Sequence, residues 1–319
     1  MPLFINTNVS SLYAQQAAQR ASDRLDISYQ RLSSGLRINS AKDDAAGIQV
    51  ANNLTTQLNG LTQGNRNAQD AIAFAQTVEG ALDEVTNMLQ RIRTLAVQSA
   101  NGTMTDADRQ GIQAEVDALT EEITRIAEET TFAGADMLNG KASVVRFQVG
   151  PDPSSIVEID LTTPMDVDGL AKLAAFYAGT EQYKLYEKEV TNTAGNTVMC
   201  VAYANFTDIF NNKESDAPGI DVSSPSSAQM VLAGIDSLVT AVDRKRADLG
   251  AIQNRLEATV RNQENVKENV SNARATIRDT DWAEETANLT QQDIIQQATA
   301  TILVQANQRP QIALSLINA

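Results

Sequence analysis

Few residues of this chain have the types and spacing that catalysis or metal binding requires. Histidine is absent from all 319 residues, which removes the most common general base and the most common metal ligand. The single cysteine, Cys200, lies in the apolar run Val198–Val201, where a thiol usually packs as a small hydrophobic group. We therefore expect no catalytic residue, no metal ligand and no cofactor.

One short acidic segment has a faint likeness to a calcium-binding loop. It is Asp166-Val167-Asp168-Gly169. An EF-hand loop also needs a glutamate at its twelfth position, and this segment has none there. We interpret the segment as a turn.

The charge balance excludes two classes of partner. A net charge of −15 argues against nucleic acid and against an anionic membrane, because both attract clustered Lys and Arg.

No run approaches the roughly 18 apolar residues that a membrane helix requires. The first residues, Met1–Asn6, show no basic segment before an apolar stretch, so no conventional secretory signal is predicted. Composition alone therefore favours a cytoplasmic protein.

Proline is distributed so that both ends of the chain can form long helices. It is absent from residues 3–150 and 226–309, and most of the seven prolines lie in residues 151–225. Because proline interrupts helix interiors, we expect helical ends and an inserted middle segment. This organisation is typical of a structural subunit rather than of an enzyme.

Two long segments have the spacing of a coiled-coil seam. Alternating steps of three and four residues meet mostly apolar side chains from Leu54 to Ala96 and again from Ile235 to Ile277. Neither helix can bury its stripe alone, so we expect the two to pack on each other. The residues predicted for the core of this rod are Leu82, Val85, Leu89, Ile92, Leu249, Ile252 and Leu256.

Further elements complete the predicted rod. Thr105 and Asp108 have the spacing of a capping box, which predicts the start of a third helix. Alternating apolar residues near 145–149 and 157–161, separated by turn residues, predict a β-hairpin. A helix near 168–178 and one or two strands near 183–206 are expected beyond it.

The extreme ends differ from the rod because residues 1–19 and 294–308 carry no side-chain charge. A helix in water normally shows charge on its wet face, so these helices are expected to lie against neighbours. Their apolar stripe residues are Ile5, Val9, Leu12, Ile295 and Ile302.

The segment Leu32–Gly47 carries the most specific pattern. It predicts a helix that ends at Gly35, a short connection, and a second helix capped by Ser40 with Asp43 completing a capping box. The segment also strongly resembles the N-terminal signature of bacterial flagellin. The resemblance covers roughly 1–162 and 222–319, and its other motifs are Gln90–Gln98, Arg246–Glu257, Ile277–Asp281 and Gln305–Gln308.

Two positions depart from the pattern of the family. The family commonly ends near Leu-Ser-Leu-Leu-Arg, whereas Leu314–Ile317 is followed here by Asn318 and Ala319. Arg309 stands where an apolar residue is usual.

The resemblance implies a structural subunit that polymerises into the flagellar filament used for motility. Such a subunit is exported unfolded through the flagellum's own channel and is added at the distal tip. The location implied is extracellular, in the filament, and it replaces the cytoplasmic expectation. The partners implied are further copies of the chain, a flagellar export chaperone, and the cap and junction proteins.

The fold class implied is mainly α. Long paired N- and C-terminal coiled-coil helices would form a rod bundle with a β-hairpin, and a small α+β insert domain would follow. Residues 1–43 and 280–319 would be the terminal helices of an inner tube. Residues 44–164 and 222–279 would be the rod bundle, and 165–221 the variable outer insert.

Two other functions stay open at this stage. A hook–filament junction protein belongs to the same superfamily and shares the terminal helices. An enzyme, or a flagellin with an enzymatic insert, is the other, but the peptidase-bearing members use a His-Glu-x-x-His helix, which a chain without histidine cannot supply.

The resemblance also implies a partner outside the bacterium. Some members of the family are sensed by an animal Toll-like receptor through the rod. The matching positions here are Arg91, Leu95 and Glu115.

Overall fold

The computed structural model describes residues 7–178, 182–191, 197–205 and 219–317. The chain divides into two compact units. The first, which we call the terminal unit, comprises residues 1–60 and 265–319, and the second, the rod unit, comprises residues 61–264. Two long helices contribute residues to both units, and each unit is described below by itself.

The fold is mainly α, as predicted, with three two-stranded antiparallel sheets among the described residues. The helices are α1 (Val9–Ser34), α2 (Ala45–Ser99), α3 (Asp106–Glu129), α4 (Val167–Ala178), α6 (Pro225–Arg278) and α7 (Trp282–Ile317). The strands are β1 (Thr131–Phe132), β2 (Ala135–Asp136), β3 (Ser143–Gln148), β4 (Ile156–Leu161), β5 (Gln182–Thr191) and β6 (Thr197–Asn205). The pairs are β1 with β2, β3 with β4 and β5 with β6.

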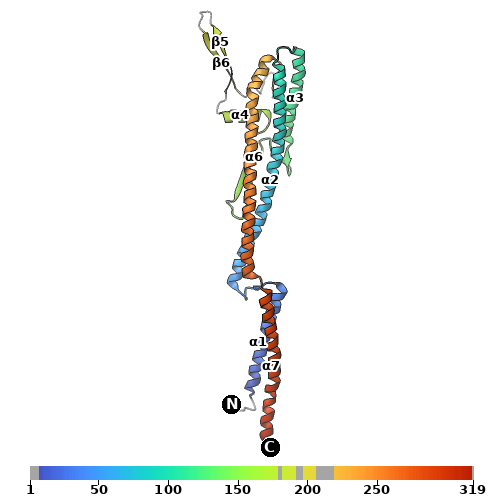
Figure 1. Cartoon of the computed structure of the whole chain (residues 1–319), viewed down its shortest axis with the longest axis vertical. Coiled ribbons are helices and arrows are strands. Elements are labelled where there is room, and N and C mark those ends of the chain that lie inside the picture. Colours follow the sequence, from blue (N-terminus) through green and yellow to red (C-terminus); the bar gives the residue numbers. More distant parts are fainter. Residues whose placement is uncertain (1–6, 179–181, 192–196, 206–218, 318–319) are drawn as a thin grey trace. The chain divides into compact units, whose positions relative to one another are not determined.

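Within the rod unit, α2 and α6 lie side by side and run in opposite directions (Figure 1). Polar contacts between them recur along the pair, with residue numbers that rise on one helix as they fall on the other. These contacts are Arg93 with Asp236 (2.7 Å), Arg246 with Asp83 (2.8 Å) and Gln253 with Glu79 (2.8 Å). The pairing predicted from the two seven-residue repeats is therefore present.

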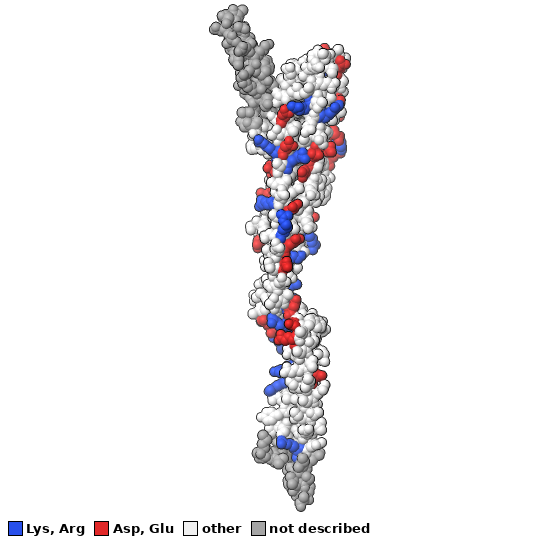
Figure 2. All heavy atoms as spheres, in the orientation of Figure 1, with Lys and Arg blue, Asp and Glu red and all other residues white. Residues whose placement is uncertain are grey.

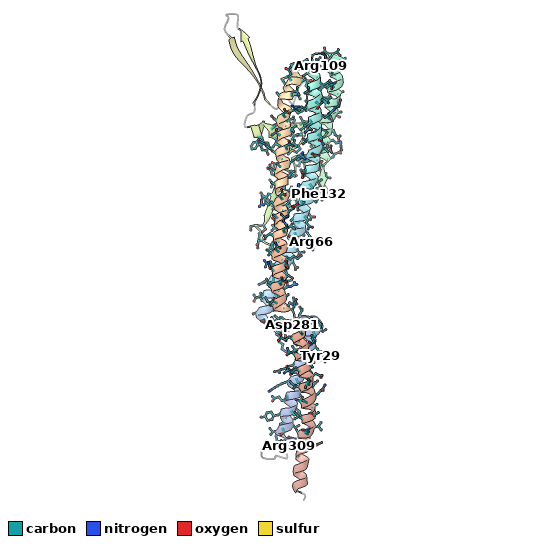
Figure 3. All side chains as sticks on the ribbon, in the orientation of Figure 1. Tyr29, Arg66, Arg109, Phe132, Asp281 and Arg309 are labelled. Carbon is teal, nitrogen blue, oxygen red and sulfur yellow. The ribbon has the colours of Figure 1, made fainter. Side chains whose placement is uncertain are left out.

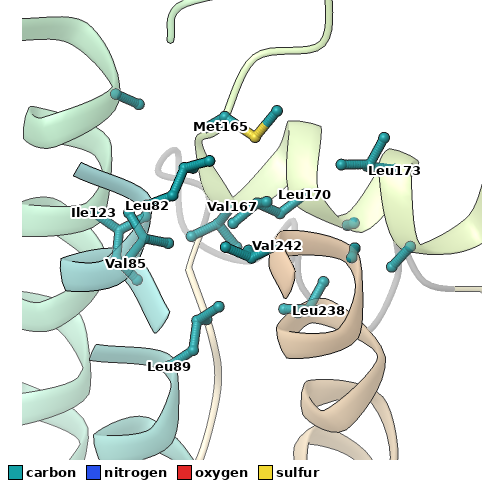
Figure 4. Packing of buried hydrophobic residues seen from close by; sticks show 14 of the residues in the cluster. Leu82, Val85, Leu89, Ile123, Met165, Val167, Leu170, Leu173, Leu238 and Val242 are labelled. Atoms are coloured by element: carbon teal, nitrogen blue, oxygen red, sulfur yellow. The ribbon is translucent and has the colours of Figure 1, made fainter. Parts of the chain in front are cut away.

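Apolar side chains from α2, α3, α4 and α6 meet in one continuous core (Figure 4). Six of the seven residues predicted for the rod core are buried: Leu82, Val85, Leu89, Ile92, Leu249 and Leu256. Ile252 is half-buried and packs against the core. Leu256 belongs to a second, smaller cluster with Ala68, Ala71, Val149 and Val157.

Helix α3 begins at the predicted capping box. The Thr105 backbone N–H donates to Asp108 Oδ2 at 3.0 Å, and the Asp108 N–H donates to Thr105 Oγ1 at 3.3 Å. These bonds satisfy two donors that a helix start would otherwise leave unpaired. They also hold the pKa of Asp108 below its ordinary value, chiefly through the bond from the Thr105 hydroxyl.

The predicted hairpin is formed by β3 and β4, in which Val145 faces Ile159 and Phe147 faces Val157. Its turn is held on both long helices of the rod. Asn67 Nδ2 of α2 donates to the Gln148 carbonyl at 2.8 Å, and the side-chain amide of Gln263 in α6 donates to the Val149 carbonyl. The close approach at Val149 is the reason for a glycine in the facing turn of α2, at Gly64. A Cβ there would lie 2.5 Å from the Val149 oxygen.

Helix α4 confirms the helix predicted near 168–178, and its position adds a finding. Met165, Val167 and Leu170 are fully buried in the core that contains Leu82 and Val242 (Figure 4). The first part of the segment expected to be an outer insert therefore packs inside the rod. A helix this short cannot bury its apolar face by itself, and the apolar side chains of the rod cover that face.

In the terminal unit, α1 ends where predicted, at Gly35, whose φ of +70° is the left-handed conformation that favours glycine. The predicted cap of the next helix was wrong. Asp43 Oδ2 accepts from the Ser40 N–H at 2.8 Å in a turn, and α2 starts only at Ala45. Asp44 is the capping residue, because its Oδ1 accepts from the Gly47 N–H at 2.9 Å.

Candidate functional site: the pair of helices α1 and α7

Helices α1 and α7 form an antiparallel pair in the terminal unit (Figure 1). The pair is closed at one end by backbone bonds between the segment that follows α1 and the residues that precede α7. The Arg37 N–H donates to the Arg278 carbonyl at 2.7 Å, and the Thr280 N–H donates to the Gly35 carbonyl at 3.0 Å. These bonds hold the end of α1 beside the start of α7.

The seam between the two helices is made of small and polar side chains. Among the α7 residues whose burial is described, 282–310, the buried ones recur at every seventh position: Glu285, Gln292, Thr299 and Ala306. The buried residues of α1 are Ser11, Ala14, Ala21, Leu25 and Ser28. A seven-residue repeat is the spacing of a coiled coil, but an ordinary coiled coil fills these positions with large apolar residues. The pair therefore gains little from apolar burial between its own helices.

Specific polar contacts lie at both ends of the seam. Ser28 Oγ donates to Glu285 Oε1 at 2.5 Å, and Arg31 Nη1 lies 3.4 Å from the other oxygen of Glu285. At the opposite end, Ser11 Oγ donates to Asn307 Oδ1 at 2.8 Å. These bonds satisfy buried polar groups, and they set the position of one helix along the other.

Large apolar side chains of the pair point into solvent instead. Ile294 and Val304 of α7 are each 60% exposed, and Ile302 is 52% exposed. The other large exposed apolar residues of the pair are Val9, Leu12, Tyr13, Ile27 and Tyr29, with Trp282 at the start of α7. Figure 3 shows Tyr29 among the side chains of this unit. In the same orientation, Figure 2 shows few charged side chains on the part of the pair between Tyr29 and Arg309. A helix pair that exposes this many large apolar side chains is a candidate interaction site.

Four of the five residues predicted to mediate assembly lie on this pair. Val9, Leu12 and Ile302 are exposed, and Ile295 is half-buried. Ile5 lies outside the described residues. The sequence reasoning missed the polar seam, because a search for apolar spacing passes over Glu285, Gln292 and Thr299. Their exact seven-residue interval was the signal that could have identified it.

Arg309, which departs from the family pattern, has a partner on α1. Its Nη1 donates to Ser10 Oγ at 3.1 Å, with Arg309 exposed (Figure 3) and Ser10 half-buried. The substitution is therefore accommodated at the edge of the seam.

The three residues matched to receptor recognition lie in the rod unit. Arg91 Nε and Nη2 both donate to Glu115 Oε1, at 2.8 and 2.6 Å, and the two side chains are about half exposed. Leu95, one turn further along α2, is only 2% exposed. The structure thus brings the two charged residues together on the surface and buries the leucine in the rod core.

Chemistry-bearing groups do not converge in the described part of the chain. No cluster of three His, Cys, Asp or Glu residues that could hold a metal occurs there. Among the same residues, no helix is long and apolar enough to cross a membrane. Asp166 caps α4, since its Oδ1 accepts from the Gly169 N–H at 2.8 Å. Cys200 lies in β6, and its side chain is outside the described residues.

Comparison of the sequence with known protein families gives two matches. Residues 5–143 match the family model of the bacterial flagellin N-terminal helical region, and residues 232–317 match that of the C-terminal helical region. The solved structure of a flagellar junction protein from Legionella pneumophila is similar with a TM-score of 0.47 and 17% identity, over 73% of this chain and 100% of that one.

Similarity to curated relatives extends over nearly the whole chain. Flagellin D of Vibrio anguillarum is 38% identical over an alignment 376 positions long, which covers 99% of this chain and 100% of the relative. Flagellin A of Vibrio cholerae serotype O1 is 37% identical over 381 residues, with the same coverage. The chain therefore belongs to the bacterial flagellin family, whose members are structural proteins of the flagellar filament.

Proposed function

We propose that this chain polymerises into a flagellar filament used for motility, and that the α1 and α7 pair provides the contacts between copies. The observation that carries this proposal is that the pair buries polar side chains and exposes large apolar ones. Its seam is small and polar, whereas Ile294, Ile302 and Val304 are exposed. A helix pair that buries so little of its apolar surface needs further surfaces to cover it.

The balance of free energies supports contacts between copies rather than a free pair. Ordering a residue costs about 1–2 kcal/mol of backbone entropy. Burying one large apolar side chain contributes about 1.5–3 kcal/mol. Because the seam itself supplies few such side chains, packing of the exposed ones against neighbouring copies is the larger source of stabilisation. Folding of the two ends would then be coupled to polymerisation.

The domain arrangement follows from this proposal. Residues 1–43 and 280–319 would line an inner tube, residues 44–164 and 222–279 would surround it as the rod, and 165–221 would include the outermost part. The absence of side-chain charge from residues 1–19 and 294–308 supports a position in close contact with neighbouring copies.

Export and further partners belong to the same proposal. The subunit would leave the cell unfolded through the flagellar channel and be added at the distal tip, beneath the cap and beyond the junction proteins. A single cysteine supports this route, because no disulfide within the chain has to be broken before threading. An export chaperone would cover the apolar faces of the ends before assembly.

A host Toll-like receptor is proposed as a partner of the rod unit. The exposed ion pair of Arg91 and Glu115 supplies a polar surface patch at the matched positions. Leu95 is buried, so its part would be to support α2 beneath that patch.

Seeded polymerisation tests the proposed function. Purified chain is added to short filament seeds, and extension is followed by electron microscopy and by the subunit concentration left in solution. The variant I302S/V304S should raise that critical concentration more than about tenfold, because two apolar side chains lose their burial. The control is Phe176→Ser, which changes an exposed apolar residue of the rod unit. Equal behaviour of both variants, or no extension by the unchanged chain, would contradict the proposal. A junction protein would not extend seeds into long filaments.

A further inference from the structure

Pro310 lies in the interior of α7 and removes one hydrogen bond from it. Proline has no backbone N–H, so the carbonyl four residues earlier, that of Ala306, loses its usual helical donor. Ala306 is only 4% exposed, and a buried carbonyl without a donor is costly. The helix therefore needs a donor from outside itself at this position.

Asn8, the residue just before α1, supplies that donor. Its Nδ2 donates to the Ala306 carbonyl at 2.7 Å. The same side chain caps α1, because its Oδ1 accepts from the Ser11 N–H at 3.2 Å. An amide side chain can perform both tasks because it carries a donor and an acceptor. Serine and aspartate cap helices about equally well, but neither offers an amide donor of this reach.

The contact is specific to one position along α7. Pro310 is the single proline between Trp282 and Ile317, so the helix interior contains a single carbonyl that lost its donor in this way. Other side-chain bonds at this end, such as that of Ser11 with Asn307, join two side chains that could find partners elsewhere. A backbone acceptor created by proline cannot move along the helix.

We propose that Asn8 and Pro310 are a matched pair that sets the register of α1 on α7. Pro310 creates the free acceptor, and Asn8 places the first turn of α1 against it. Asn8 is in this sense a positioning residue for assembly. The inference rests on the proposed function, in which the α1 and α7 pair forms the contacts of the polymer.

Four full-length chains test the pairing: the unchanged chain, N8S, P310A and the double variant N8S/P310A. N8S keeps a capping residue and adds no charge, but it loses the donor to Ala306. P310A restores the N–H that bonds the Ala306 carbonyl within the helix. The critical concentration for extension of seeds is measured for each chain, and helix content in the filaments is measured by circular dichroism.

N8S should raise the critical concentration about tenfold in the unchanged background, the size expected for a buried acceptor left without its donor. In the P310A background the same change should have little effect, because the acceptor no longer needs Asn8. An equal effect of N8S in both backgrounds, or none in either, would overturn the inference while leaving the proposed function intact. An unchanged chain that fails to extend seeds would contradict the proposed function, and this inference with it.

Discussion

The hydroxyl of Ser28 in α1 donates a 2.5 Å hydrogen bond to the buried carboxylate of Glu285 in α7. Glu285 occupies a seam position, where its side chain is 8% exposed, and its second oxygen lies 3.4 Å from Arg31. A buried carboxylate is stable only when its oxygens have partners. The contact therefore penalises any sliding of α1 along α7, and it does so at the end of the seam opposite to Asn8.

Removing this contact should destabilise the pair in a coupled manner. We expect Ser28→Ala to cost about 1–3 kcal/mol of filament stability, since it leaves a buried acceptor without its donor. Glu285→Ala should also be costly, but Ser28→Ala should add little to it, because the acceptor is then gone. The depolymerisation temperature of filaments from the two single variants and the double variant measures this coupling. Strictly additive effects would show that the two side chains act independently.

The rod core should respond to truncation as any tightly packed core does. Leu89 and Leu256 are fully buried, so Leu89→Ala or Leu256→Ala is expected to cost about 2–5 kcal/mol of unfolding free energy. Arg66 is exposed on the same long helix, and Arg66→Ala should cost well under about 1 kcal/mol. Thermal unfolding of the purified chain distinguishes them. Equal melting temperatures for all three variants would contradict the packing of α2 on α6.

Periodicity was sufficient to predict the rod because its core is apolar. The stripes through Leu89 and Leu256 identify α2 and α6 directly, and Thr105 with Asp108 identifies the start of α3. The terminal pair was harder, since its seam at Gln292 and Thr299 carries no apolar signal. Hydropathy shows which side chains avoid water, and in α7 the large residues Ile294, Ile302 and Val304 are exposed, so hydropathy alone does not identify the seam.

Local competition explains the remaining differences. Ser40 and Asp43 fit the spacing of a capping box, and their hydrogen bond forms in the turn before α2. The helix itself is capped by Asp44, which accepts a hydrogen bond from the N–H of Gly47 three residues later. A Cβ at residue 47 would lie 2.5 Å from Asp44 Oδ2, so a glycine at this position allows the close approach of the Asp44 carboxylate. Two overlapping capping patterns cannot be ranked from spacing alone.

The hairpin of β5 and β6 should be dispensable for polymerisation. β5 and β6 pair with each other as a separate two-stranded sheet. Replacing residues 182–205 with a short Gly/Ser linker should leave filament formation and the melting temperature unchanged. Extending the replacement to 168–218 removes Leu170 from the core and should lower the melting temperature of the rod. Loss of filaments with the shorter replacement and a folded rod would show that this hairpin supplies an essential contact.

Receptor signalling is expected to depend on the exposed ion pair of the rod. Arg91→Ala and Glu115→Ala should each reduce signalling in reporter cells that carry the receptor, because each removes half of the bidentate contact at that surface. Arg125→Ala on α3 is the matched control, since Arg125 forms an exposed ion pair with Glu122. Monomers should signal and intact filaments should not. Undiminished signalling by both variants would exclude this surface as the site of recognition.

The two ends are expected to gain their stable helical structure only on assembly. Isolated helices that leave apolar faces in water are marginally stable, and the seam between α1 and α7 contributes few large apolar side chains to offset the ordering of both segments. Limited proteolysis of the monomer should therefore remove residues 1–40 and 283–319 early and leave a core near 45–280. The same protease should leave filaments intact, because neighbouring copies cover Ile294, Ile302 and Val304. Ends that resist cleavage in the monomer as well as the rod does would show that the pair is stable by itself, and that coupling of folding to polymerisation is wrong.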